Sequence, residues 1–509
     1  MKAFLLNHDT DFDLEGALPP GHEALIQDLE LTTLIATMAA GDQLVFDVVQ
    51  RVLLLSLSDP DAIVYRQQIL ADCLREPAVV RDLYALAGDA LKAERSIWRG
   101  LGTGYPRTIL STAVQKMELF VGSLRGLLEA AETHGEKFTS PGWTRFFTML
   151  QEELDAPYFE LVESQLKALQ FKGGMLMSAQ LGAGNKGAAY TLRWPRMQSL
   201  LGRVFDRSGY SFTIPERDDS GFRALGDLED KAANPAANAL SQAVDHVHSF
   251  FVMLRVEIGF YVGALNLSER LAELGEPTTL PVAIGSGERV LAGRGLYDVS
   301  LRLTTPEPVV GNDVNADGKS LVMITGANQG GKSTFLRSIG QAQLMTQSGM
   351  FVGAESLQMN MCDAIFTHYK REEDRAMESG KLDEELARMG EIADHITPGS
   401  MLLCNESFAS TNEREGSQIA REVVTALLES GVKVLFVTHM FDLANSFHRQ
   451  GLDTALFLRA ERGTDGARPF RISEGDPLPT SYGEDSYRKV FGRGIHGAPS
   501  AVPERGRGT

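Results

Sequence analysis

The sequence predicts an α + α/β protein, in which a helical N-terminal half precedes a P-loop domain with a mostly parallel sheet. Three observations support this prediction. Apolar residues recur at helical spacing from residue 22 to about 169. From Pro281 onward, short apolar runs alternate with helical stretches, which is typical of parallel sheets. Within that second half, the spacing G-x-x-x-x-G-K-S begins at Gly326, directly after the apolar run 321–325.

Composition limits the function classes. The chain has 509 residues, of which 43% are hydrophobic and 23% charged, so a globular protein of two to four domains is expected. A net charge of −18 argues against a protein that binds nucleic acid or membranes through charge alone, although a local basic face stays compatible with it. The N-terminus does not have the pattern of a signal peptide, and no run reads as a membrane span.

The three cysteines, Cys73, Cys362 and Cys404, are scattered and show neither metal-ligand spacing nor a disulfide framework. Their pattern favours a reducing compartment. We therefore expect a cytoplasmic protein with no membrane partner.

In the N-terminal half, helices are expected over residues 31–40, 42–57, 60–76, 79–98, 111–133 and 141–154. Residues 174–193 resemble a β-hairpin insert, with a glycine-rich turn at 182–187. Residues 206–235 are expected to be loop with short elements. Residues 238–274 then predict one long helix, with two helices kinked near Gly259 as the alternative. Residues 311–318 are expected to form a solvated loop, and residues 493–509 a disordered tail.

The glycine-rich stretch carries the strongest functional signal. A strand, a glycine loop and a helix let backbone N–H groups surround phosphates, and the helix presents its positive end to them. The nucleotide-binding candidates are Gly326, Ala327, Asn328, Gln329, Gly330, Gly331, Lys332, Ser333 and Thr334. Lys332 is expected to reach the β- and γ-phosphates, and the Ser333 hydroxyl to ligate Mg²⁺. The alternative is a chance match in a glycine-rich turn.

Two further strands predict the rest of an ATP site. The apolar run 401–404 ends in Asn405 and Glu406, and ligands bind at the carboxyl edge of open parallel sheets. Glu406 is the candidate that polarises the attacking water, and Asn405 is a candidate Mg²⁺ ligand where an aspartate is usual. The run 433–437 ends before His439, a candidate γ-phosphate or water contact. The alternatives are a solvated charge for Glu406 and a packed histidine for His439.

These stretches resemble the MutS family. The segment GANQGGKST at 326–334 is similar to the family's GPNMGGKST, and residues 405–411 stand where the family has Asp-Glu and a glycine-rich loop. Further similar stretches lie at 366–367, 379–381, 437–440 and 480–483. The resemblance implies a helical core and lever domain over 1–280, with a short β insert near 174–193, and an ABC-like ATPase domain over 281–492. It also implies ATP and Mg²⁺ as cofactors, a homodimer formed through the ATPase domain, and DNA as a partner.

Several departures from the family pattern limit that implication. The chain begins with core-like helices, so we expect no mismatch-reading domain, and residues 174–235 are too few for a full-size clamp. Leu382 and Asp383 stand where the family has Ser-Thr. Two functions therefore stay open: a MutS-like ATPase acting on DNA in repair or recombination, and a nucleotide-gated scaffold with weak hydrolysis and protein partners. A transporter-type or chromosome-structuring ATPase is disfavoured, because no LSGGQ-type stretch is present.

Overall fold

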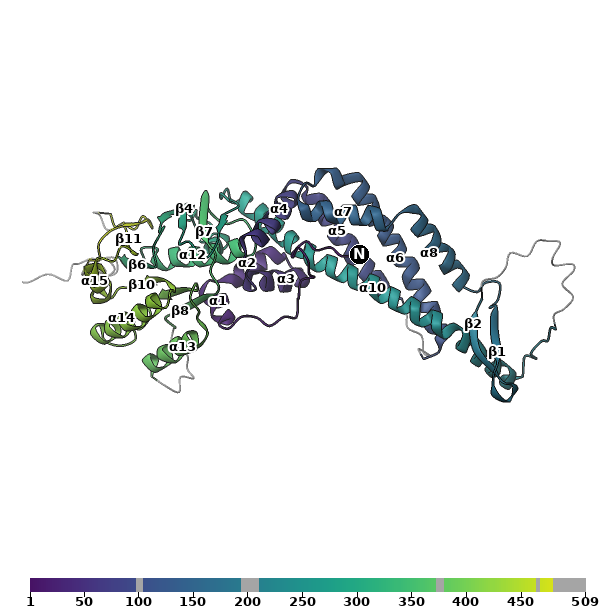
Figure 1. Ribbon diagram of the computed structural model, residues 1–509. Helices are drawn as coiled ribbons and strands as arrows, with labels where there is room; N and C mark the ends of the chain where they lie inside the picture. Colours follow the sequence, from purple (N-terminus) through teal and green to yellow (C-terminus); the bar gives the residue numbers. More distant parts are fainter. Residues whose placement is uncertain (98–103, 194–209, 372–379, 464–466, 479–509) are drawn as a thin grey trace, which may run out of the picture. The chain divides into compact units, whose positions relative to one another are not determined.

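The computed structural model describes residues 1–97, 104–193, 210–371, 380–463 and 467–478. It confirms the predicted mixed class, because helices and sheets both build the chain (Figure 1). The chain divides into two compact units. The helical unit comprises Met1–Asp13 and Ala71–Val262, and the sheet unit comprises Leu14–Leu70 and Gly263–Thr509. The tail expected at 493–509 lies outside the described residues.

The described part of the helical unit contains α5 (Pro77–Ser96), α6 (Pro106–His134), α7 (Pro141–Glu153), α8 (Ala156–Leu169), most of α10 (Asp219–Glu273) and the short 3₁₀ helix η1 (Gly135–Lys137). A proline lies in the first turn of α5, α6, α7 and α8, where its missing N–H leaves no helical bond unmade. The rings of Phe138, Trp143, Phe146 and Phe147 form an aromatic cluster in the core, with centroids of contacting rings 5.0 to 5.9 Å apart.

A hairpin follows α8 in the helical unit. Strands β1 (Met177–Leu181) and β2 (Gly187–Leu192) pair antiparallel, with Met177 opposite Leu192. The turn η2 (Ala183–Asn185) places Gly184 and Asn185 at φ 69° and 58°, a left-handed region that glycine and asparagine tolerate best. Glycine and asparagine at these two positions thus allow the tight reversal.

Helix α10 differs from the prediction. It begins at Asp219, about twenty residues earlier than predicted from the sequence, and runs unbroken through Gly259 for 55 residues. The expectation of a loop over 206–235 was therefore wrong for residues 219–235, where Pro235 lies inside the helix. Among the described residues, α10 is the one helix long and apolar enough to match a membrane span by composition, and 78% of that apolar window is buried inside the protein.

The described part of the sheet unit begins with α1 (His22–Asp28), α2 (Leu31–Ala39), α3 (Gln43–Leu54) and α4 (Pro60–Arg75), the last of which continues into the helical unit. Its larger sheet has the order β12-β11-β6-β10-β9-β8. The strands are β6 (Leu321–Gly326), β8 (Ile365–Tyr369), β9 (Met401–Asn405), β10 (Lys433–Val437), β11 (Ala455–Ala460) and β12 (Ile472–Glu474). Neighbouring strands are parallel except β12, which pairs antiparallel with β11.

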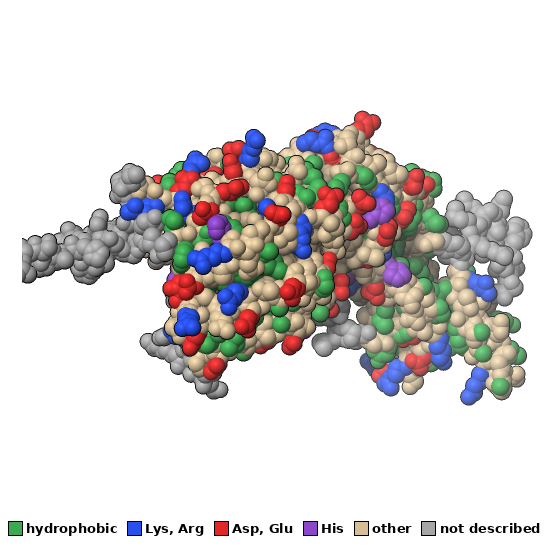
Figure 2. All heavy atoms as spheres, turned by 60° about the vertical axis from the view of Figure 1, so that its left-hand side comes forward, with side chains coloured by type: hydrophobic (Ala, Val, Ile, Leu, Met, Phe, Trp, Pro, Cys, Tyr) green, Lys and Arg blue, Asp and Glu red, His purple; other side chains and the backbone are tan. Residues whose placement is uncertain are grey.

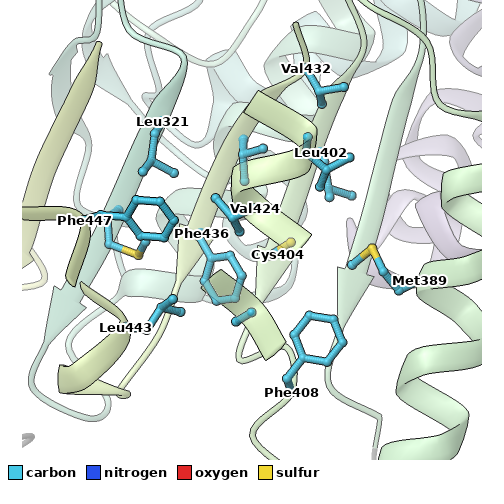
Figure 3. Packing of buried hydrophobic residues seen from close by; sticks show 14 of the residues in the cluster. Leu321, Met389, Leu402, Cys404, Phe408, Val424, Val432, Phe436, Leu443 and Phe447 are labelled. Atoms are coloured by element: carbon cyan, nitrogen blue, oxygen red, sulfur yellow. The ribbon is translucent and has the colours of Figure 1, made fainter. Parts of the chain in front are cut away.

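Helices cover both faces of this sheet. On one face, Leu402 and Cys404 of β9 join Phe436 of β10 in a core closed by α13 (Lys381–His395), α14 (Glu413–Glu429) and α15 (Phe441–Gln450) (Figure 3). On the other face, Leu403 lies against Gly340 of α12 (Lys332–Gln347). Because side chains alternate along a strand, burial of both faces explains the continuous apolar run before Asn405.

A smaller four-stranded sheet has the order β3-β7-β4-β5. Its strands are β3 (Val282–Ile284), β7 (Ser356–Asn360), β4 (Leu291–Leu296) and β5 (Asn312–Asn315), and helix α11 (Val299–Thr304) follows β4. The expectation of a solvated loop over 311–318 was wrong, because β5 forms inside it. Residues 311–318 are mostly polar, and the strand was therefore not predicted. In β5, Val314 is buried and Asn312 accepts a hydrogen bond from the Ile472 backbone N–H.

Charged side chains of both signs are interspersed over the face of the molecule in Figure 2. The excess of acidic residues is therefore not gathered into one patch on that face.

Candidate nucleotide site

Three neighbouring strands place the candidate residues at one edge of the larger sheet. Val437 of β10 pairs with Ile324 of β6 on one side and with Asn405 of β9 on the other. All three strands are parallel, so their carboxyl ends meet at the same edge. The glycine loop follows β6, Glu406 follows β9, and His439 follows β10. The structure thus brings the three predicted segments together.

The glycine loop fits only because its glycines lack side chains. Gly326 has φ 106°, and a Cβ there would lie 2.9 Å from the backbone N and O of Ala460. Gly331 has φ 90° and is the N-cap of α12, where it offers no side chain to the first helical amides. Such amides, at the positive end of a helix, form a site for an anion.

Lys332 is buried at the start of α12 and points back over the loop. Its Nζ donates to the carbonyl oxygens of Gly326 and Ala327, each at 3.1 Å. Burial lowers the pKa of Lys332, the nearby Glu406 opposes that shift, and Arg468 adds to it. The ammonium group is therefore held where the loop turns, beside a carboxylate.

Ser333 and Asn405, the two candidate metal ligands, meet directly. The Ser333 hydroxyl donates to Asn405 Oδ1 at 2.8 Å. Hydroxyl and amide oxygens are hard ligands of the type Mg²⁺ accepts, although a neutral amide binds it more weakly than a carboxylate. Among the described residues, no group of three or more His, Cys, Asp or Glu side chains could hold a metal ion. Phosphate oxygens and water would have to complete the coordination.

Glu406 and His439 form a hydrogen-bonded pair. Glu406 Oε2 contacts His439 Nδ1 and accepts from the His439 backbone N–H at 3.2 Å. This side-chain hydrogen bond raises the pKa of His439 against the opposing effect of burial. The side chains are 23% and 44% exposed, so water reaches both.

The remaining loop residues differ in exposure. Ala327 and Gly330 are buried, Asn328 and Gln329 are exposed, and Thr334 is half-buried. Gln329 has φ 58°, so the loop bends sharply at this exposed position. Of the other stretches compared with the family pattern, Leu382 and Asp383 lie in the first turn of α13, while Ser379 and residues 480–483 lie outside the described residues.

Residues that the sequence did not suggest also reach the loop. Arg468 Nε donates to the Asn328 carbonyl oxygen at 3.2 Å. Beside the loop lies a mostly apolar cavity of about 440 Å³, lined by Val309, Val310, Gln329, Phe335 and Phe470 among others. No local pattern marks these residues, because about 140 positions separate Arg468 from Asn328 and only the fold joins them.

Comparison with known proteins identifies the family. A model described as "MutS2 N-terminal domain" matches residues 58–274, and one described as "MutS domain V" matches residues 322–483. The chain belongs to the MutS family. The second match includes the strand-end segments of the larger sheet, and the first covers α4 to α10.

Curated MutS relatives agree with this assignment. The chain is 28% identical over 281 residues to the DNA mismatch repair protein MutS of Synechococcus sp. (strain CC9311), covering 52% of the chain and 30% of the relative. It is 34% identical over 145 residues to that of Chloroflexus aurantiacus (strain ATCC 29366 / DSM 635 / J-10-fl), covering 28% and 15%. It is 31% identical over 256 residues to that of Thermotoga neapolitana, covering 47% and 31%. The chain thus spans less than a third of the length of these relatives.

Proposed function

We propose that this MutS-family chain is an ATPase whose hydrolysis is coupled to a dimeric clamp acting on DNA in repair or recombination. One observation supports this most strongly: a loop of glycines, a lysine, a hydroxyl, a carboxylate and a histidine meet at one edge of a parallel sheet. The residues are Gly326, Gly331, Lys332, Ser333, Asn405, Glu406 and His439. Such an edge is where parallel sheets bind ligands.

In this proposal residues 326–334 surround the phosphates of ATP. The first amides of α12 donate to phosphate oxygens, and Lys332 exchanges its two carbonyl partners for the β- and γ-phosphates. Ser333 and Asn405 hold Mg²⁺ together with phosphate oxygens and water. The cavity beside Phe470 is large and apolar enough to accept the base, which would stack on an aromatic ring.

Glu406 polarises the attacking water, which adds to the γ-phosphorus while the bond to the β-phosphate oxygen breaks, giving ADP and phosphate. His439 holds the Glu406 carboxylate and is close enough to the strand edge to sense loss of the γ-phosphate. Residues 380–383 would reach the second copy and complete its nucleotide site. Residues 1–280 would form the core and lever domain, and residues 281–492 the ATPase domain. The protein would be cytoplasmic.

Replacing Lys332 tests the site. We expect Lys332→Ala to abolish ATP binding or turnover, because no other side chain in the loop supplies that charge. Lys319→Ala is the matched control, since Lys319 precedes β6 and donates to the Asp453 carbonyl oxygen at 2.7 Å. ATP-binding titrations and phosphate-release assays on both variants test the assignment of the nucleotide site. Parental turnover in Lys332→Ala would remove the site assignment.

Replacing Glu406 tests the chemistry and the dimer. We expect Glu406→Gln to bind ATP normally and to accumulate as an ATP-bound dimer, because the amide cannot polarise water as a carboxylate does. Size-exclusion chromatography with and without ATP measures the dimer. Hydrolysis at the parental rate would assign the base elsewhere, with His439 the next candidate.

A nucleotide-gated scaffold is the second candidate, favoured by Asn405 in place of a metal-binding carboxylate and by the net charge of −18. Under this function the parent would bind ATP but show no turnover at saturating Mg²⁺, and Glu406→Gln would change nothing. Adding homoduplex, branched or mismatched DNA to the ATPase assay separates the two, because only the first function predicts stimulation by DNA.

A further inference from the structure

The turn that carries Glu406 is strained. Glu406 has φ 57° and Phe408 has φ 62°, in the left-handed region that non-glycine residues rarely adopt. Between them, Ser407 is fully buried, as is Phe408. Strain of this kind persists only where the surrounding structure holds it, and it concentrates at functional sites.

One side chain of the neighbouring strand holds both residues after Glu406. His368 of β8 lies opposite Cys404 of β9 and is fully buried. Its Nδ1 lies 2.7 Å from Ser407 Oγ, and its carbonyl oxygen lies 2.6 Å from the same hydroxyl. Its ring stacks on Phe408, with centroids 5.4 Å apart and planes at 26°.

The contacts of the imidazole fix its tautomer. Nε2 lies 3.0 Å from the Glu385 carbonyl oxygen, which only accepts, so Nε2 carries the proton. Burial lowers the pKa of His368 to about 4, which keeps the ring neutral near pH 7. Nδ1 is then an acceptor, and the Ser407 hydroxyl shares its proton between Nδ1 and the His368 carbonyl oxygen. The ring thus joins the turn after β9 to α13 through its two nitrogens.

Helices α13 and α14 also contact the turn and the residues that follow it. The Ser410 hydroxyl donates to Glu385 Oε1 at 2.8 Å, so α13 holds both the imidazole and the chain just beyond the turn. On α14, a Cβ at Gly416 would lie 2.4 Å from the Phe408 carbonyl oxygen. The turn therefore has little room to relax once His368 is in place.

We propose that His368 is a positioning residue. It holds the Glu406–Phe408 turn so that the Glu406 carboxylate faces the glycine loop, at the sheet edge where the carboxyl ends of β6, β9 and β10 meet. The proposal rests on the proposed ATPase function and assigns no chemistry to the imidazole itself. Its two contacts act on residues after Glu406, so its loss would displace the carboxylate and leave Lys332 and the glycine loop in place. It would therefore alter hydrolysis and not ATP binding.

Two amide substitutions of His368 test the two hydrogen bonds of the imidazole separately. His368→Asn places an amide near the position of Nδ1 and can keep the bond to Ser407, whereas His368→Gln places one near Nε2 and can keep only the bond to Glu385. A displacement of about 1 Å at a reacting group can lower rates roughly a hundredfold. We expect kcat to fall at least about tenfold in His368→Gln and Ser407→Ala and about threefold or less in His368→Asn, with ATP affinity within about twofold of the parent in all three.

Thr367→Val is the control, because Thr367 is also buried on β8 but faces the opposite side of the strand. Its kcat should match the parent. In the Glu406→Gln background His368→Gln should lower the residual rate no further, since the positioned carboxylate is already gone. Melting temperatures of every variant show whether kcat follows stability instead.

Parental kcat in His368→Gln, equal losses in the Asn and Gln variants, or a loss that persists without Glu406 would each overturn the proposal. If the parent hydrolyses ATP, Lys332→Ala does not, and any of these results is found, the positioning role of His368 is wrong while the proposed ATPase function stands. If the parent shows no turnover that depends on Lys332, the proposed function fails and the positioning role fails with it.

Discussion

At the scale of single residues, Asn405 is the main departure from an ordinary metal-assisted site. It keeps an acceptor oxygen 2.8 Å from the Ser333 hydroxyl but lacks a negative charge. We therefore expect a working ATPase that needs more Mg²⁺ than one with a carboxylate. Asn405→Asp should lower the Mg²⁺ concentration for half-maximal turnover, and should weaken metal-free nucleotide binding slightly through repulsion of phosphates. If both proteins need the same Mg²⁺, the amide does not limit the metal.

The Glu406–His439 pair predicts a pH-dependent contribution to stability. Because the folded pKa of His439 is raised above 6.5, the contribution is fully present below the unfolded pKa and is lost as pH rises through the folded pKa. His439 is 44% exposed, so solvent limits it to roughly 0.2–1 kcal/mol. The melting temperature of His439→Gln should lie below that of the parent near pH 6 and converge toward it above the raised pKa.

Glu406→Gln provides the control for this effect. In that background the His439→Gln substitution should lose most of its pH-dependent effect on melting temperature, because the partner charge is absent. An unchanged pH dependence there would attribute the shift to other groups near His439.

At the scale of elements, the close approach of α14 to the turn after β9 requires a glycine at position 416. A Cβ at Gly416 would meet the Phe408 carbonyl oxygen at 2.4 Å, and backbone cannot rotate away as a side chain can. We expect Gly416→Ala to destabilise the sheet unit by roughly 1–3 kcal/mol, despite the better helix propensity of alanine. Gly390→Ala in α13, with no atom within 4 Å of its Cβ, should stabilise it by about 0.5–1 kcal/mol. Urea unfolding of both variants measures the difference.

Local sequence predicted those elements whose signals are local. The strand run 433–437 matches β10, and the glycine spacing after 321–325 gave both β6 and the start of α12. The signals failed where tertiary pairing decides. Strand β5 is polar and exists because β4 pairs with it. At the start of α10 a local signal was overlooked, because the Asp218 side chain accepts a hydrogen bond from the Gly221 backbone N–H at 2.9 Å and so caps the helix that begins at Asp219.

The residues of the candidate site also fall into two groups, those that local sequence predicted and those that only the fold brings to the site. The segments 326–334, 405–406 and 439 follow apolar strands, so their types and spacing identified them. His368, Arg468 and Phe470 lie on other strands and loops, and their contacts near the site depend on which strands become neighbours in the sheet. His368 lies directly after residues 366–367, which had been noted for their resemblance, yet nothing in the spacing marks its contact with Ser407.

At the scale of the whole molecule, family membership and charge lead to one prediction about DNA. The matched models cover an N-terminal helical region and the ATPase-type region, and the net charge is −18. Neither suggests readout of base edges, so binding should depend on backbone contacts and duplex shape. We expect this chain to bind a mismatched duplex and its paired counterpart with the same affinity, and both more weakly as salt rises.

Fluorescence anisotropy at fixed salt, with one duplex and its single-mismatch version, measures this directly. The titrations should be repeated with ATP in the Glu406→Gln variant, because a dimeric clamp would form only in the nucleotide-bound state. A preference of about tenfold for the mismatch, or roughly 1.4 kcal/mol, would contradict the prediction. It would locate base recognition within this chain, where the hairpin β1–β2 is the first segment to delete. Equal affinities that rise together with ATP would instead match a clamp that reads shape and not sequence.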